Sequence, residues 1–243
     1  METFNLRHYK ISLEYEFRDI IETPIVINAI NPHSWVVAEK DPEFRYALME
    51  SDYLIPDGIG IVLASRLLWK KKIKKFAGND LHLMILKELN RNAGKCFYLG
   101  ASDNVLNKIH AKLEQLYPNI RCMTLSPPYK DNFTREENAV MINQINDYSP
   151  DVLFVGMTAP KQEKWIFKHK SELNVKVMCA IGGAFDFFAG TKRRAPSWMI
   201  NCGLEWLFRL MLEPKRMWKR NFVSTPLFIY NMLQLRWKRN PDK

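Results

Sequence analysis

The sequence predicts an α/β protein whose sheet is mostly parallel, with helices on both faces and a basic helical appendage at the C-terminus. Short apolar runs that stop at glycine, such as 152–155 and 175–181, have the length of buried parallel strands. Helix-length amphipathic segments separate these runs, and this alternation is typical of a covered parallel sheet. We therefore expect a Rossmann-like core over residues 1–193 and a basic, amphipathic appendage over 194–243.

The first elements follow from local signals. Residues 4–13 can form a small hairpin, and residues 24–30 form a strand. Asp41 is expected to cap a helix with Pro42 in its first turn. The alternative is an Asp-x-Glu metal clamp with Glu43, and it is weaker because proline at the first helical position needs no further reason.

The next strand, 53–55, ends at Asp57. Gly58 and Gly60 then suggest a dinucleotide fingerprint, but Leu63 stands where its third glycine belongs. Asp57 is a carboxylate at the carboxyl end of a strand, where ligands of such sheets bind. It can equally cap the following helix, and the residue chemistry alone favours capping.

The later elements are read in the same way. The basic run Lys70–Lys75 is interpreted as a solvated face. The remaining expected elements are helix 80–92, strand 96–99, a helix opening at 100–103, strand 120–125, helix 135–148, strand 152–155, strand 175–181, and helices after Gly203 that break at Pro214 and Pro226.

A polar residue with aromatic neighbours follows the last of these strands. Asp186 stands among Phe185, Phe187 and Phe188, just after the glycine pair 182–183. We expect this turn to lie at the carboxyl edge of the sheet. The pattern predicts a pocket for a flat base and a hydroxyl-rich sugar.

Several classes of site have no support in the sequence. The four cysteines form no Cys-x-x-Cys pair and are expected to be buried, reduced thiols. The five histidines form no ligand-spaced pair, and no Asp-x-Asp occurs, so we expect neither a metal site nor a cofactor. The charged first 19 residues do not resemble a signal peptide, and no uncharged apolar run has the length of a membrane span.

The charge is concentrated at the C-terminus. From Lys192 onward there are twelve Lys and Arg against three acids, so nearly all of the net charge of +10 lies there, with four of the seven tryptophans. A basic, aromatic tail on a nearly neutral body predicts an anionic partner. Residues 227–237 also suit an interfacial helix on an anionic membrane, and we expect removal of the chain after Thr225 to weaken membrane binding while sparing activity in solution.

Four motifs carry a resemblance to a known family. They are Ala-Pro-Lys-Gln-Glu at 159–163, Gly-Gly-Ala-Phe-Asp at 182–186, Arg-Ala-Pro at 194–196 and Gly-Leu-Glu-Trp-Leu at 203–207. In this order they resemble the WecG/TagA/CpsF family of bacterial glycosyltransferases, over about 27–220. The resemblance implies a UDP-sugar donor, N-acetylmannosamine-like, and an undecaprenyl-diphosphate-linked sugar acceptor. It places the enzyme on the cytoplasmic face of the cell membrane, in surface polysaccharide, capsule or teichoic acid synthesis.

The resemblance also implies roles for individual residues. Asp57 matches the family's proposed general base, and Asn31 would line the acceptor side with it. Gln162 and Asp186 would contact the nucleoside or the donor sugar. Ala29 departs from the family, which often has threonine there, so the identity of the sugars stays open.

Inverting glycosyl transfer needs a base for the attacking hydroxyl and positive charge for the departing diphosphate. Without a metal motif, the second task falls to arginines, whose planar fork suits a diphosphate. The candidates are Arg209, Arg216 and Arg220, with Arg209 and Arg216 expected to act in catalysis and Arg220 in substrate binding.

Two other classes of function compete with a glycosyltransferase. The basic tail could bind nucleic acid, but it mixes charge with long aliphatic runs, whereas groove binders concentrate polar contacts. We therefore expect no nucleic-acid partner. A non-catalytic nucleotide-binding module is the other alternative, and the presence of both Asp57 and the arginines argues against it. The sequence leaves homo-oligomer formation open.

Overall fold

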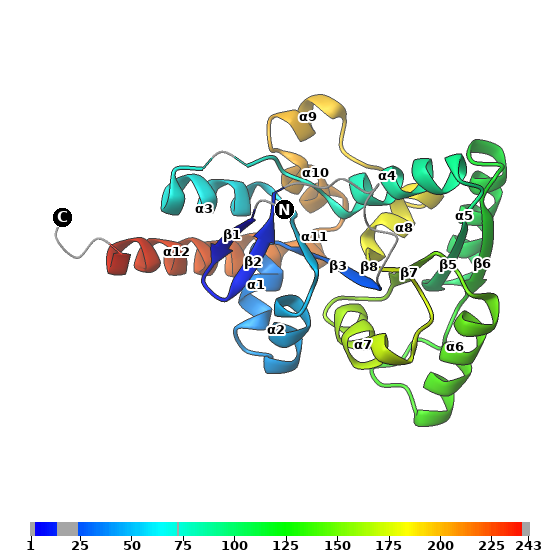
Figure 1. Ribbon diagram of the computed structural model, residues 1–243. Helices are drawn as coiled ribbons and strands as arrows, with labels where there is room; N and C mark the ends of the chain where they lie inside the picture. The colour runs from blue at the N-terminus through cyan, green and yellow to red at the C-terminus, as the bar shows by residue number, and fades with distance from the viewer. Residues whose placement is uncertain (1–2, 14–23, 72, 240–243) are drawn as a thin grey trace.

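The computed structural model describes residues 3–13, 24–71 and 73–239, and its centre is a fully parallel sheet (Figure 1). The strand order is β4-β3-β8-β7-β5-β6. The strands are β3 (Ile25–Ile30), β4 (Tyr53–Pro56), β5 (Lys95–Gly100), β6 (Arg121–Leu125), β7 (Val152–Gly156) and β8 (Val177–Ala180). The predicted α/β class and all six predicted strands are confirmed.

Helices cover both faces of this sheet. One face packs against α4 (Gly78–Arg91), α5 (Asp103–Leu116) and α8 (Gly182–Ala189), and the other against α6 (Arg135–Tyr148) and α7 (Lys161–His169). Asp41 caps α2 (Pro42–Met49) by accepting a hydrogen bond from the Phe44 amide, as predicted. The short helix η2 (Lys170–Glu172) continues α7.

A third core cluster lies beyond the sheet edge formed by β4. The predicted N-terminal hairpin is confirmed as β1 (Thr3–Leu6) and β2 (Tyr9–Ser12), and it packs with α1 (Pro32–Ala38), α3 (Ile59–Trp69) and α12 (Thr225–Arg239). Phe228 and Met232 of α12 are buried in this cluster, and the Phe228 ring meets Trp35 edge-on at 5.5 Å between centroids. The inner face of the last helix is thus part of the hydrophobic core.

The basic segment is helical throughout most of its length. Its elements are α9 (Ser197–Asn201), α10 (Glu205–Leu212), α11 (Pro214–Lys219), the π-helical turn η3 (Arg220–Ser224) and α12. The break at Pro214 is confirmed, but the break predicted at Pro226 is wrong. The Thr225 amide bonds five residues back to Arg220, and this wider turn places Pro226 in the first turn of α12, where its missing amide costs no hydrogen bond. The division at residue 193 stays a prediction, and residues 240–243 lie outside the described part.

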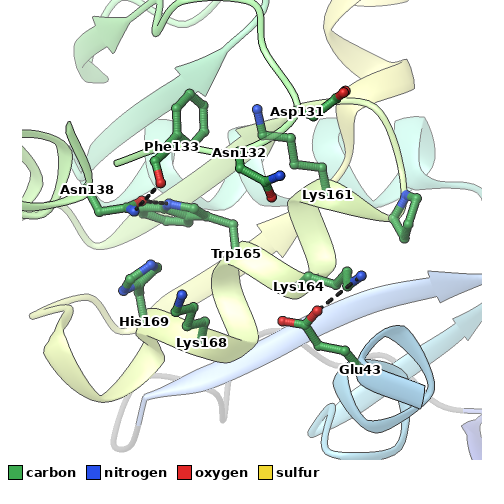
Figure 2. Close-up of a pocket in the computed structure, with 11 residues that line it drawn as sticks. Glu43, Asp131, Asn132, Phe133, Asn138, Lys161, Lys164, Trp165, Lys168 and His169 are labelled. Carbon is green, nitrogen blue, oxygen red and sulfur yellow. Dashed lines mark hydrogen bonds and ion pairs between the residues drawn. The ribbon is translucent and has the colours of Figure 1, made fainter. Parts of the chain in front are cut away.

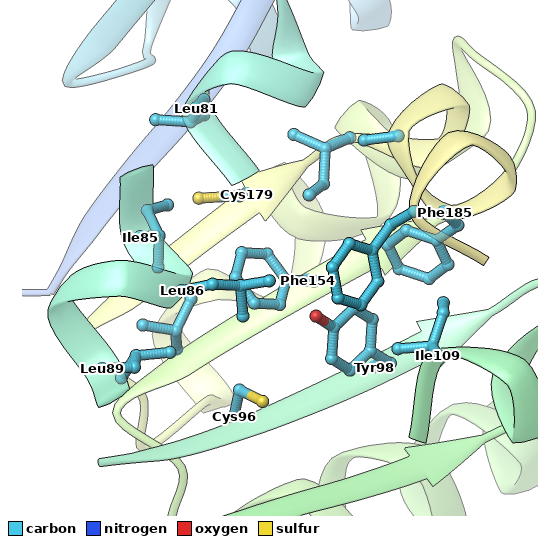
Figure 3. Packing of buried hydrophobic residues seen from close by; sticks show 14 of the residues in the cluster. Leu81, Ile85, Leu86, Leu89, Cys96, Tyr98, Ile109, Phe154, Cys179 and Phe185 are labelled. Atoms are coloured by element: carbon cyan, nitrogen blue, oxygen red, sulfur yellow. The ribbon is translucent and has the colours of Figure 1, made fainter. Parts of the chain in front are cut away.

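The aromatic residues around Asp186 do not form the predicted pocket. Gly182 and Gly183 begin α8 rather than a loop, and the helical period turns Phe185 and Phe188 into the core. Figure 3 shows Phe185 packed beside Tyr98 and Phe154. Gly156 permits this approach, since a Cβ there would lie 2.3 Å from the Phe185 ring.

The prediction of buried, reduced cysteines is confirmed in part. All four are free thiols, but only Cys96 and Cys179 are buried, while Cys202 is exposed. No helix among the described residues is long and apolar enough to cross a membrane.

Candidate functional site

The sequence-predicted polar residues meet where neighbouring strands end. The Asp57 amide donates to the Ile30 carbonyl at 2.9 Å, so Asp57 and Asn31 follow β4 and β3 side by side. Next along the sheet, β8 ends at Ala180 and is followed by Gly182, whose amide donates to Oε1 of Gln162 at 3.1 Å. The carboxyl ends of four adjacent strands thus carry these groups, which is the usual location of a ligand site.

Asn31 has a structural task in this arrangement. Its side-chain oxygen accepts hydrogen bonds from the His33 and Ser34 amides, both at 3.0 Å, and so caps α1. The oxygen is therefore committed to the helix. Contact with a sugar would fall to the amide nitrogen, which has no hydrogen-bond partner among the described residues.

Asp57 is a carboxylate in a crowded, charged surrounding. Burial and the nearby carboxylate of Glu205 raise its pKa, while Arg209, Lys75 and Arg220 oppose that rise. The residue as a whole is only partly buried. A carboxylate whose pKa is raised and which faces cations has the chemistry of a general base.

Two of the three predicted arginines, Arg209 and Arg220, lie close enough to Asp57 to lower its pKa. Burial, followed by the like charge of Arg209, lowers the pKa of Arg220 to about 10, which leaves it protonated at neutral pH. The guanidinium of Arg209 lies 5.5 Å from the centre of the Phe187 ring, and its buried Nε has no hydrogen-bond partner within residues 3–13, 24–71 and 73–239. Arg216 lies further out, with its Nη1 bonded to Glu213 at 2.7 Å.

A contact between α1 and η3 holds the basic segment at this edge. Nδ1 of His33 lies 2.8 Å from the Ser224 hydroxyl. Burial, with a smaller effect of Arg220, lowers the pKa of His33 to about 4, so the imidazole is neutral at neutral pH. The imidazole thus packs near Arg220 without adding charge.

Gln162 lies in the first turn of α7 and is largely buried. Its Nε2 donates to Glu163 at 2.9 Å, and Gly182 fits so closely that an added Cβ would lie 2.6 Å from Oε1. Burial raises the pKa of Glu163 to about 7, and its second oxygen has no partner. Gln162 therefore ties the β7 and β8 ends together, whatever else it contacts.

Asp186 is held by polar partners rather than by aromatic rings. It accepts from the Thr191 hydroxyl at 2.9 Å and pairs with Lys192 at 2.9 Å. Lys192 also lies 3.6 Å from Glu213, which pairs with Arg216. This row of alternating charges connects α8 to the start of α11.

A separate pocket of about 270 Å³ lies on the outer side of α7 (Figure 2). Lys161, Lys164, Lys168 and Trp165 line it, and none of the predicted site residues does. Lys164 pairs with both Asp41 and Glu43, so this carboxylate pair already has a counter-ion.

Sequence reasoning missed two charged residues beside Asp57. Lys75 was assigned to a solvated basic run, yet it turns inward and pairs with Glu205, 130 residues away. Glu205 belongs to the motif at 203–207, which carried the family resemblance without a role for this residue. The closeness of both to Asp57 appears only in the folded chain.

A parallel sheet with charged and polar groups at its carboxyl edge is typical of enzymes that bind their ligand there, and similarity to known proteins identifies the family. The model of the glycosyl transferase WecG/TagA/CpsF family matches residues 3–242. The chain belongs to this family and is a glycosyltransferase of the hexosyltransferase class.

Three relatives share one name, N-acetylglucosaminyldiphosphoundecaprenol N-acetyl-β-D-mannosaminyltransferase. The protein of Bacillus subtilis strain 168 is 35% identical over 209 residues, which cover 86% of this chain and 79% of the relative. The protein of Bacillus spizizenii is 30% identical, with 91% and 83% covered. That of Staphylococcus aureus strain MRSA252 is 31% identical, with 88% and 82% covered.

Proposed function

We propose that the enzyme transfers an N-acetylmannosamine-like sugar from a UDP-sugar to a sugar linked to undecaprenyl diphosphate, with inversion and without a metal ion. The names of the relatives support the acceptor and the transferred sugar. The observation that carries the proposal is the grouping of Asp57 with Arg209 and Arg220 at the carboxyl edge of the sheet.

In this mechanism Asp57 takes the proton of the attacking acceptor hydroxyl. The hydroxyl oxygen forms a bond to the anomeric carbon while the bond from that carbon to UDP breaks. The departing diphosphate keeps the electron pair, and Arg209 and Arg220 stabilise its growing charge. The unpartnered Nε of Arg209 supplies a ready donor for a phosphate oxygen. Arg216 would join them by exchanging its contact with Glu213 for the diphosphate.

The donor class can be tested by ligand binding. Asp186 and Gln162 lie on the α8 side of the site, where we place the nucleoside and the donor sugar. In a thermal-shift panel of nucleotides and UDP-sugars, UDP compounds should raise the melting temperature more than ADP, GDP or CDP. An equal response to all diphosphates would contradict selective binding of uridine.

Activity is expected to survive EDTA. In the part of the chain that the structure describes, no three His, Cys, Asp or Glu side chains gather to hold a metal ion, and cations surround Asp57 instead. Turnover measured with and without excess EDTA should therefore agree. Loss of activity that Mn²⁺ or Mg²⁺ restores would contradict the metal-free mechanism.

We further propose that the basic segment rests on an anionic membrane, at its inner face. Ile229, Leu233 and Trp237 recur every fourth residue on α12 and are exposed, Trp237 by 75%. Trp218 of α11 and Phe222 of η3 are exposed as well, and so are Lys215 and Lys219. Aromatic rings can enter the headgroup region while the lysines meet anionic lipid.

Changing Ile229, Leu233 and Trp237 together to serine should weaken binding to anionic vesicles roughly tenfold or more, because each exposed apolar side chain would otherwise be buried in the interface. Vesicle sedimentation measures this effect. Turnover on a soluble, short-chain acceptor should stay near the wild-type value. Leu116 and Val140, exposed on α5 and α6, provide the matched serine control. If the control variant loses vesicle binding equally, the proposed surface is wrong.

A further inference from the structure

We propose that Lys192 binds the diphosphate of the donor and is a further substrate-binding residue of this enzyme. The inference rests on the proposed UDP-sugar donor and extends it to a residue outside the basic helices. Lys192 follows α8, and its backbone amide donates to the Asp186 carbonyl at 3.2 Å. This bond fixes the start of the side chain next to the proposed donor site.

Nζ of Lys192 lies between the residue assigned to the nucleoside or sugar and the residue assigned to the diphosphate. It lies 2.9 Å from Oδ2 of Asp186 and 3.6 Å from Oε2 of Glu213. The same Glu213 oxygen is 2.7 Å from Nη1 of Arg216. Lys192 therefore stands between Asp186, which we assign to the nucleoside or sugar, and Arg216, which we assign to the diphosphate.

The ammonium group of Lys192 has hydrogen-bond donors that its present contacts do not use. It carries three N–H bonds, and only the contact with Asp186 has the length of a hydrogen bond. Glu213 is too far for one and is already held by Arg216. The Lys192 side chain is about one-third exposed, so a phosphate oxygen can reach it. Such an oxygen can replace Glu213 as the second partner while the Asp186 contact remains.

The neighbouring cations do not share this position. Arg193 is exposed and forms no ion pair with any of the described residues. Arg194 turns away, with Nη2 2.8 Å from Asp80 and Nε 3.9 Å from Glu205. Of these three consecutive basic residues, only Lys192 faces the row formed by Asp186, Glu213 and Arg216.

The charge balance agrees with this role. The cations of the site are Lys75, Lys192, Arg209, Arg216 and Arg220, and the acids are Asp57, Asp186, Glu205 and Glu213, while Arg194 is balanced by Asp80. The cations exceed the acids by one, so the loss of Lys192 would leave the two equal. Without it, a diphosphate would enter a site with no surplus of positive charge.

Calorimetric titration with UDP tests the inference. Lys192→Met should weaken UDP binding roughly 10–100-fold, the usual effect of a lost hydrogen bond to a charged group. Lys192→Arg should restore most of the affinity. Arg193→Met removes the same charge one residue away and should change the affinity less than about twofold, with both variants keeping the wild-type melting temperature.

A double-mutant cycle with Asp186→Asn separates direct contact from positioning. If Lys192 touches the diphosphate, Lys192→Met still weakens UDP binding in the Asp186→Asn background. If its effect vanishes there, Lys192 only holds Asp186 and the inference is wrong. It is equally wrong if Lys192→Met binds UDP like the wild type. Failure of the proposed donor would appear instead in the wild-type protein, as absence of UDP binding.

Discussion

Asp57→Asn is expected to lower turnover by about 10²–10⁴-fold while UDP-sugar binding stays close to that of the wild type. Asparagine has nearly the same shape but cannot accept the proton of the acceptor hydroxyl. Asp57 faces Arg209, Lys75 and Arg220, and the amide keeps the space between them filled. Turnover at saturating donor and acceptor, together with calorimetric binding of the UDP-sugar, measures the two effects separately.

The pH profile gives a second measure of the same role. Burial and Glu205 raise the pKa of Asp57, and a base works only when deprotonated. Activity should therefore fall, as pH decreases, at a higher pH than for an ordinary aspartate, and Asp57→Asn should lack this limb.

Asp52 provides the matched control for this substitution. It lies at the other end of the same strand, where its side chain accepts from the Val26 amide at 2.8 Å. Asp52→Asn keeps an acceptor there and should retain turnover. Near-wild-type turnover of Asp57→Asn at saturating acceptor would exclude Asp57 as the base.

Phe228→Ala is expected to reduce the free energy of unfolding by about 3–5 kcal/mol. Phe228 is only 1% exposed and packs in the cluster that joins α12 to the N-terminal hairpin. Removing its ring leaves a cavity beside Trp35. Denaturant unfolding measures the loss.

The next residue along the helix supplies the control. Ile229 is half exposed, and Ile229→Ala should change the stability by less than about 0.5 kcal/mol. An equal, small effect of both substitutions would mean that α12 does not contribute to the core.

This packing changes the expectation that residues 227–237 are dispensable for turnover. Their removal would take Phe228 and Met232 out of the core, so a truncated enzyme could lose activity through instability alone. The packing role of α12 belongs to its inner face, and the proposed membrane contact belongs to its exposed face. Substitutions on the exposed face therefore test membrane binding without disturbing the fold.

The fold was predictable because local signals mark its strands. Each apolar run stops where the chain must turn, as at Gly156, and amphipathic segments fill the intervals. The continuous helix through Pro226 was not predictable, because a single extra residue in the π-helical turn relieves the clash that proline causes in a regular helix. The pocket predicted around Asp186 is absent because these residues form a helix. Side chains adjacent in sequence point to different sides of a helix, so Phe185 and Phe188 enter the core and leave Asp186.

The closeness of two candidate site residues was predictable from the strands, whereas Arg209 and Arg220 were predicted from the charge of the tail. Asp57 and Asn31 each follow a strand directly, and parallel strands end at the same edge. Lys75, Glu205 and Lys192 reach the site through loops and helices, and their partners lie far away in sequence. No spacing rule connects such residues, so only the folded chain shows that they gather around one centre.

The most direct test of the account is transfer itself, measured with UDP-N-acetylmannosamine and N-acetylglucosaminyl-diphosphoundecaprenol in the presence of EDTA. The account predicts a disaccharide on the lipid, with inverted configuration at the transferred anomeric carbon, formed by the wild type and lost in Asp57→Asn. No product from the folded wild-type enzyme with this pair or with any other UDP-sugar would contradict it, as would retained configuration in the product.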